Sequence, residues 1–199
     1  MASEFALVGT TPRNVRRDRL GVFKERPAQL VNGRPSYQLE GSGQLMMWFA
    51  GSAWRIGTSE NVGKAVGAVK AKDQAQRPEL ITATWQVGDE DNKTWVPAPG
   101  LRCISGAALH AERQAAASTF VIMGATPSSK HQSRMGLYKK RAQLVNGWPS
   151  YEAAFDDGKY AMWHAGYHWF VGLKADLGKN RGFLAALDGA LRPEAIAAK

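Results

Sequence analysis

The apolar residues of this chain lie in short runs that are separated by glycine, proline, asparagine and serine. Residues 45–49 are continuously apolar, whereas residues 54–57 alternate between apolar and polar. Both patterns are typical of β-strands, the first buried on two faces and the second on one. Asn32 and Gly33 lie between two runs and tolerate the positive φ of a type I′ hairpin turn. The pattern therefore predicts an antiparallel meander of four strands over residues 21–57.

This pattern occurs twice along the chain. Residues 118–198 repeat residues 3–83 at a spacing of about 115, and the run at 28–33 returns almost unchanged at 142–147. A duplicated unit is normally a scaffold that buries the residues its copies share. We therefore expect a mainly β fold of two tandem homologous repeats, each an antiparallel β-meander with a short helix or long loop.

The copies also set the expected domain boundaries. Residues 1–105 form the first repeat, which ends in a hairpin that carries Trp85 and Trp95. Residues 106–118 are rich in alanine and are expected to form a linking helix. The second repeat then occupies residues 119–199.

The stretch after each meander lacks a strand pattern. Residues 62–75 combine small and charged side chains, which predicts a short helix or a long loop, and the copy at 178–191 has a more helical composition. We expect no strand in either stretch.

The second repeat has no counterpart of the final hairpin. The sequence stops where the first repeat enters that hairpin, so Trp85, Trp95 and residues 101–104 have no copy. Either the chain is a fragment, or something else completes the second repeat. An incomplete sheet leaves backbone groups unpaired along an edge. We expect the second repeat to borrow strands, from the first repeat or from another chain, by β-augmentation.

Tyrosine and tryptophan recur at matching positions of the two copies. Such rings could line a shared ligand site, but a ring buries a large apolar area and more often forms the core of a small domain. We predict a core role for the recurring pairs Tyr37 and Tyr151, Trp48 and Trp163, and Trp54 and Trp169.

Positions that differ between the copies are better guides to a specific function. Several aromatic and basic residues gather near the hairpin turns at such positions, either as a surface that stacks on a sugar or peptide or as an interface between the repeats. The candidate ligand- or partner-binding residues are Arg34, Trp148, His164, Tyr167 and His168.

The chain is strongly basic, with a net charge of +9. This charge permits a nucleic acid, an anionic membrane surface or an acidic protein as partner and selects none of them. We interpret the basic clusters as solvated loops and strand edges in preference to a binding stripe. Nucleic acid is therefore a possible partner but not the favoured one. The candidate basic patch comprises Arg16, Arg17, Arg19, Lys139, Lys140 and Arg141.

Candidate chemistry is scarce. His164 and His168 flank a turn at Gly166 without a third ligand, which predicts no metal site, and no motif indicates a cofactor or an enzyme. Cys103 is the only cysteine, so no intrachain disulfide is possible, and a reducing intracellular compartment, cytoplasm or organelle, is favoured over secretion. We expect no signal peptide and no membrane span, although a removed targeting peptide would leave no trace.

The two meanders share a motif that resembles a tandem repeat of uncharacterised proteins from algae and other protists. The motif runs from a glycine and an aromatic residue through Val-Asn-Gly, Pro-Ser-Tyr and Met-Trp to a final Trp-x-Ile/Val-Gly, over residues 21–57 and 136–172. The resemblance implies a β-rich interaction module and carries no catalytic residue. We therefore predict a non-enzymatic binding or assembly module that acts through protein–protein contacts. Such a module could be a subunit of a larger complex. A carbohydrate-binding module and a basic nucleic-acid-binding protein are the alternatives.

Overall fold

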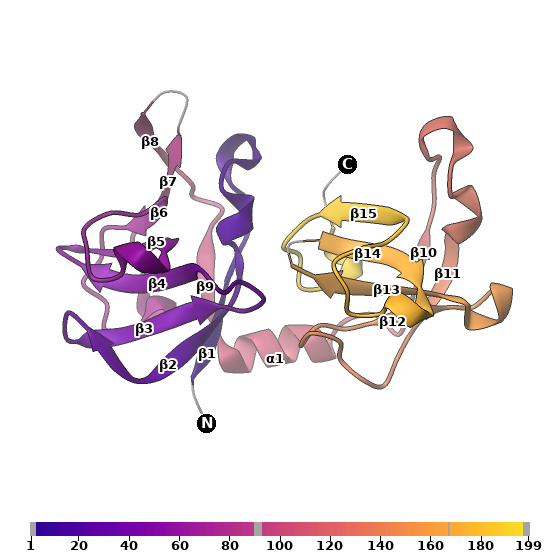
Figure 1. Ribbon diagram of the computed structural model, residues 1–199, viewed down its shortest axis with the longest axis horizontal. Helices are drawn as coiled ribbons and strands as arrows, with labels where there is room; N and C mark the ends of the chain where they lie inside the picture. The colour runs from indigo at the N-terminus through magenta and orange to yellow at the C-terminus, as the bar shows by residue number, and fades with distance from the viewer. Residues whose placement is uncertain (1–2, 90–92, 167, 197–199) are drawn as a thin grey trace. The chain divides into compact units, whose positions relative to one another are not determined.

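The protein consists of two compact units, residues 1–110 (unit 1) and 111–199 (unit 2). The computed structural model describes residues 3–89, 93–166 and 168–196, and each unit is built on one curled antiparallel β-sheet (Figure 1). The predicted mainly β class is confirmed. One α-helix, α1 (Gly106–Gln114), occupies the segment where a linking helix is predicted.

Unit 1 contains a sheet of nine strands within its described residues. Their order is β8-β7-β6-β5-β4-β3-β2-β1-β9, so the first eight strands along the chain form a continuous meander and β9 pairs with β1. The strands are β1 (Glu4–Val8), β2 (Gly21–Val31), β3 (Arg34–Leu39), β4 (Leu45–Ala50), β5 (Ala53–Thr58), β6 (Val69–Ala71), β7 (Trp85–Asp89), β8 (Thr94–Pro97) and β9 (Arg102–Ser105).

Unit 2 contains a sheet of six described strands in simple chain order, β10 to β15. These strands correspond to β1–β6 of unit 1, and the predicted meanders over residues 21–57 and 136–172 are both confirmed. The strands are β10 (Thr119–Ile122), β11 (Gly136–Lys140), β12 (Tyr151–Ala153), β13 (Tyr160–Ala165), β14 (His168–Leu173) and β15 (Leu184–Leu187).

Short 3-10 turns of three residues each lie between the strands. They are η1 (Pro12–Asn14), η2 (Arg17–Arg19), η3 (Ser59–Asn61), η4 (Pro78–Leu80), η5 (Pro127–Ser129), η6 (Gln132–Arg134), η7 (Asp156–Gly158), η8 (Lys174–Asp176) and η9 (Pro193–Ala195).

The expectation that residues 62–75 and 178–191 contain no strand was wrong. Each stretch supplies a short strand of the meander, β6 and β15 respectively. The backbone N–H of Ala68 donates to the Ile56 carbonyl at 2.7 Å, and its counterpart in unit 2 donates to Val171 at 2.7 Å. A strand of three or four residues is too short to show alternation in the sequence, and its pairing with a long neighbour decides its conformation.

The sheet of unit 1 curls until its two ends meet. Residues 98–101 lead directly from β8 into β9, and Arg13, after β1, forms an ion pair with Asp89 at the end of β7. Gly9 lies so close to this segment that a Cβ atom there would stand 1.8 Å from the Gly100 carbonyl oxygen. Its copy in unit 2, Gly124, has nothing within 4 Å of the same point. This close approach is therefore made in unit 1 and, among the described residues, not in unit 2.

The recurring aromatic residues form the core, as predicted. Tyr37, Trp48, Trp54 and their three copies are all 1% exposed or less. The indole N–H groups also donate to matching backbone carbonyls, Trp48 to Lys64 at 2.9 Å and Trp54 to Ala75 at 2.8 Å. In unit 2 the corresponding bonds, from Trp163 to Lys179 and from Trp169 to Ala190, measure 2.8 and 2.9 Å. Each ring therefore fills the core and fixes a loop at once.

The sheets bury side chains on two faces at their centre. Trp48 lies on the outer face of β4, where Met46 and Ala50 join it and Val31 and Val62 pack over the group. In unit 2, Trp163 lies in an equivalent cluster with Phe170, beneath Val145 and Leu177. The fully apolar run at 45–49 is explained by this burial on both sides, as predicted.

The predicted hairpin at Asn32 and Gly33 is present, with positive φ values of 53° and 78°. The Asn32 side chain has a second role that the turn pattern does not predict. Its amide donates to the carbonyls of Phe49 and Gly63, at 2.9 and 3.0 Å, and so ties the hairpin to two other segments. The amide of Asn146 makes the same two bonds in unit 2.

The packing of Trp48 predicts the effect of a methyl group at Gly57. A Cβ atom there would stand 2.9 Å from the Trp48 ring and 3.2 Å from the Gly67 Cα. We expect Gly57→Ala to lower the free energy of unfolding by about 1–3 kcal/mol, because the core must shift to accept it. Chemical denaturation measures the change. Gly43→Ala is the control, since nothing lies within 4 Å of its Cβ position. Equal stability of the two variants would contradict the packing described here.

Candidate partner-binding surfaces

Trp148 and His164 form a stacked pair within unit 2. Their ring centroids are 4.0 Å apart, and the edge of Trp169 meets the Trp148 ring at 6.0 Å. Trp148 is only 4% exposed and His164 is 5% exposed. The predicted stacking residues are thus brought together, but against each other and the core of their own unit rather than at an open surface.

Unit 1 holds a different pair at the same two positions. Arg34 replaces the tryptophan and Phe49 the histidine, with the guanidinium carbon 3.5 Å from the ring centroid. Arg34 also donates to the Ala75 carbonyl at 2.6 Å, the same carbonyl that accepts the Trp54 N–H. The two positions therefore differ together between the units. The pair in unit 1 packs beside Trp54, and the pair in unit 2 packs beside its copy, Trp169. A cation–π contact in one unit takes the place of a ring stack in the other.

The two remaining candidates lie near the β13–β14 turn. His168 is half-buried and packs against the Phe170 ring, with centroids 5.3 Å apart. It pairs with Ala165 in the strand register, so it does not stand beside the His164 ring as a metal ligand would. Tyr167 lies outside the described residues. Among the described residues, no group of three His, Cys, Asp or Glu side chains is placed to hold a metal ion.

Burial controls the ionisation of His164. Loss of solvent lowers the pKa of the imidazole to about 4, and a hydrogen bond with the backbone of Asp188 opposes the shift without cancelling it. Its Nε2 atom is buried and has no hydrogen-bond partner within the described part of the chain. The ring is therefore neutral at physiological pH.

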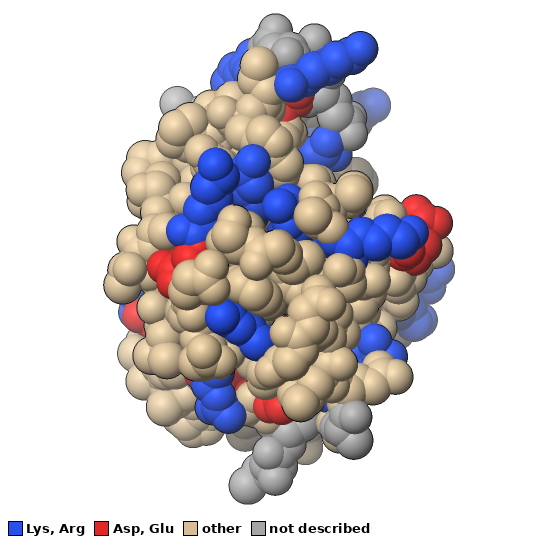
Figure 2. Space-filling view, turned by 90° about the vertical axis from the view of Figure 1, so that its left-hand side faces the viewer, with Lys and Arg blue, Asp and Glu red and all other residues tan. Residues whose placement is uncertain are grey.

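Most of the candidate basic patch is engaged in local contacts. Arg16 donates to the Gly88 carbonyl at 3.2 Å, Arg19 lies 3.3 Å from Asp18, and Arg141 lies 3.9 Å from Glu152. Arg17 is half-buried with a partner of its own, and Lys139 is exposed. On the side of the molecule drawn in Figure 2, the blue Lys and Arg side chains lie in several separate groups.

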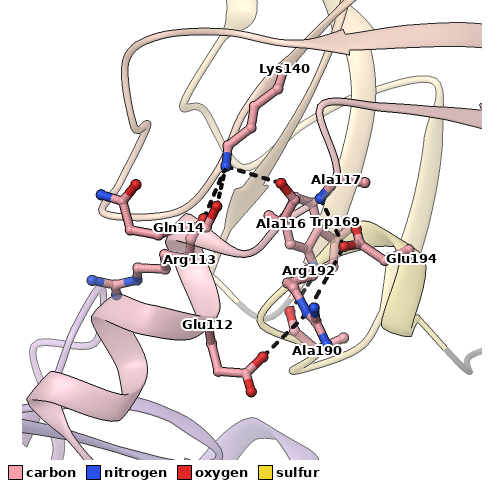
Figure 3. A network of polar contacts seen from close by, with 10 residues as sticks. All are labelled: Glu112, Arg113, Gln114, Ala116, Ala117, Lys140, Trp169, Ala190, Arg192 and Glu194. Carbon is pink, nitrogen blue, oxygen red and sulfur yellow. Dashed lines mark hydrogen bonds and ion pairs between the residues drawn. The ribbon is translucent and has the colours of Figure 1, made fainter.

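Lys140 fixes the end of helix α1 to the sheet of unit 2. Its ammonium group donates to the carbonyls of Arg113, Gln114 and Ala116 at 3.1, 3.2 and 3.1 Å (Figure 3). These are carbonyls at and beyond the last turn, which lack partners within the helix and lie at its negative end. The sequence indicated a basic residue here but gave no sign of this capping role.

A second contact holds the same segment. Glu194 accepts a hydrogen bond from the backbone N–H of Ala117 at 2.9 Å, and Arg192 lies 3.2 Å from Glu112 (Figure 3). Arg192 and Glu194 are the copies of Arg77 and Glu79. The side chains of each pair are in contact, at 3.9 Å in unit 2 and 3.7 Å in unit 1. The recurrence of this Arg-Pro-Glu motif in both copies was the signal in the sequence that could have indicated the contact.

The outer edge of β10 is open among the described residues. In unit 1 the corresponding strand, β1, pairs along that edge with β9, and its residues 5–8 are buried. No described strand pairs with the same edge of β10. Its apolar side chains are exposed as a result, Val121 to 52% and the adjacent Met123 to 81%.

The opposite edge, at β15, is also open within the described part of unit 2. Its counterpart, β6, pairs with β7 through Val69 and Val87. Lys70 and Lys72 of unit 1 are replaced in β15 by Ala185 and by Leu187, which is 41% exposed. Free edge strands are usually protected by charged side chains, lysine above all. Here the paired strand carries the lysines and the open strand does not.

Comparison of the chain with protein-family models, with curated proteins and with solved structures found no match. None of the described helices is long and apolar enough to span a membrane.

The burial of His164 predicts a pH-dependent stability. The unfolded state takes up a proton near the ordinary pKa of 6.5, whereas the folded state does so only near 4. Stability is therefore lost as the pH falls through this window, by on the order of 3 kcal/mol. We expect His164→Phe, which copies the ring of Phe49, to remove this part of the pH dependence in urea unfolding measured at a series of pH values. His131→Gln, at an exposed histidine, should keep it. Identical pH profiles for the two variants would disprove the assignment.

The capping role of Lys140 can be tested at an adjacent pair of lysines. Lys140→Met keeps the aliphatic stem but removes the ammonium group, and we expect a loss of about 1–2 kcal/mol. Hydrogen exchange should speed up in the last turn of α1. Lys139→Met changes the same charge at an exposed position and should leave both measurements unaltered. Protection that is unaffected by Lys140→Met would rule out the cap.

Proposed function

We propose that this protein is a non-enzymatic assembly module whose second unit binds a protein partner by strand addition. The observation that carries the proposal is the contrast between homologous edges. β1 and β6 are each paired on their outer side in unit 1, and β10 and β15 are not paired there among the described residues of unit 2. The partner takes the places that β9 and the β7–β8 hairpin occupy in unit 1.

The pairing partners in unit 1 define the chemistry that such a strand needs. β7 places Val87 opposite Val69 and Trp85 opposite Ala71, so it presents an apolar residue at every second position. A partner strand with the same alternation would cover Leu184 and Ala186 of β15 and satisfy the free backbone groups. Backbone hydrogen bonds supply affinity in this mode, and the alternating side chains supply specificity.

The alternatives have less support. A carbohydrate platform needs an exposed ring, whereas Trp148 is buried against His164. A nucleic-acid stripe needs free cations along one surface, whereas most of the patch residues have local partners. Both edges of unit 2, in contrast, present exposed apolar side chains beside free backbone groups.

A peptide with the sequence of residues 84–97 provides a direct test. We expect the labelled peptide to bind the full chain saturably in a fluorescence anisotropy titration, because it reproduces the hairpin that covers β6. A scrambled peptide should not bind. Leu187→Lys should weaken binding at least tenfold, because it replaces an exposed apolar side chain at the open edge of β15 with a charged one.

Leu30→Lys is the matched control, since Leu30 is 69% exposed and lies on β2 of unit 1, away from the tested edge. Binding that is equally strong for the scrambled peptide, or equally weakened by Leu30→Lys, would refute strand addition at β15. Light scattering over a range of concentrations identifies a second copy of the chain as the partner if the mass rises and Leu187→Lys abolishes the rise.

A further inference from the structure

Unit 1 carries a cleft that is separate from the strand edges of unit 2. Its volume is about 460 Å³, within the range of small-molecule sites. The floor is made by small residues of neighbouring strands and the loop before β6, namely Gly57, Gly67, Ala68 and Gly88. Trp95 and Lys93 line the cleft from the β8 side, and Arg16 and Arg19 line it from the segment after β1.

Two residues of the floor, Gly57 and Gly67, have no room for a side chain. A Cβ atom on Gly67 would stand 2.8 Å from the Ile56 carbonyl oxygen, and one on Gly57 would meet the Trp48 ring at 2.9 Å. Both contacts are shorter than packed atoms allow. Neither position can therefore carry a larger residue unless the packing around it shifts.

Among the lining residues that the structure describes, most of the charged side chains are positive. Asp89 lies among the lining residues, but Arg13 already forms an ion pair with it. Arg16, Arg19 and Lys93 supply three cations to the lining. Trp95 is half-buried, and the ammonium group of Lys70 lies 3.7 Å from its ring centroid, so this aromatic wall also carries a cation.

Unit 2 shows what fits in the corresponding place. Phe183 stands at the position of Ala68, and its backbone N–H makes the same bond to the neighbouring strand. The guanidinium carbon of Arg134, the copy of Arg19, lies 4.7 Å from the Phe183 ring centroid. His131, the copy of Arg16, lies 5.1 Å from it. In unit 2 an aromatic ring of the chain itself thus lies against the copies of Arg19 and Arg16.

We propose that the cleft of unit 1 binds an aromatic ring that bears an anionic group. The ring takes the place of the Phe183 side chain and packs on the Arg19 guanidinium, as Phe183 packs on Arg134. Cation–π packing of this kind is favourable when the guanidinium is partly shielded from water. The anionic group faces the cations of the described lining, Lys93 among them.

Two common sources offer this chemistry, a nucleotide and a phosphorylated tyrosine. We test both on the full chain by isothermal titration, with adenosine monophosphate and phosphotyrosine as probes. Adenosine, tyrosine and inorganic phosphate are the controls that lack either the charge or the ring. We expect at least one of the two probes to bind saturably and at least tenfold more tightly than its controls.

Ala68→Phe is the decisive variant, because it moves the ring of unit 2 into unit 1. It should reduce binding at least tenfold while the unfolding curve stays close to that of the parent, since the same backbone position already accepts phenylalanine in unit 2. Arg19→Gln should weaken the probes without changing the fold. Leu30→Ala, far from the lining residues in the sequence and absent from the cleft, should bind as the parent does.

Binding of adenosine monophosphate alone identifies a nucleotide, and binding of phosphotyrosine alone identifies a modified peptide; either supports the proposal. Inorganic phosphate that binds as tightly as both probes would overturn it, because the ring would then contribute nothing. No saturable binding of either probe, or unchanged binding by a folded Ala68→Phe variant, would overturn it as well. These outcomes are independent of the peptide titration at β15, so either proposal can fail alone.

Discussion

The buried tryptophans, whose indole N–H groups reach the backbone of distant loops, are the interaction on which both units depend. A ring on β4 or β5 fills space in the core, and its N–H ends on a carbonyl that lies beyond the next strand. The bond satisfies a buried N–H donor, which would otherwise lower the stability of the fold. It also sets where the loop returns to the sheet. Unit 2 makes both bonds again with closely similar lengths. The β6 and β15 strands are therefore placed by tryptophans that precede them in the sequence.

From this shared framework the two units differ at the ends of their sheets. Unit 1 continues beyond β6 and beyond β1, and its ends approach each other through Gly9 and the Arg13–Asp89 ion pair. The six described strands of unit 2 end at β10 and β15, and at the β15 edge Ala185 and Leu187 stand where unit 1 has Lys70 and Lys72. Differences in composition thus coincide with differences in pairing, which is why we place the partner at the edges and not at the buried Trp148.

Much of the fold could be predicted from the sequence, because local rules govern the parts concerned. Asn32 and Gly33 specify their turn, and the apolar run at 45–49 specifies a strand buried on both faces. β6 and β15 could not be predicted, because their conformation depends on pairing with a neighbour and not on their own few residues.

The candidate sites could be predicted only in part. The positions that differ between copies were found, and Trp148 does meet His164, but the sequence cannot show that the two rings bury each other. The role of Lys140 at the helix end was hidden for the same reason, since its three acceptors are backbone atoms. The cleft of unit 1 appears only when Ala68 and Phe183 are compared in space.

The matched exchange of Arg34 and Phe49 for Trp148 and His164 has a consequence for the history of the gene. Tandem duplications tend to be made uniform when one copy overwrites part of the other. A short tract transferred across only one of these two positions would leave arginine facing histidine, or tryptophan facing phenylalanine, over the same core ring. The first mixture would bring a guanidinium against a buried imidazole, which receives a cation less well than the phenylalanine ring does and repels it when protonated. Packing at this one spot therefore penalises partial overwriting, and so helps two copies of one ancestor to remain different.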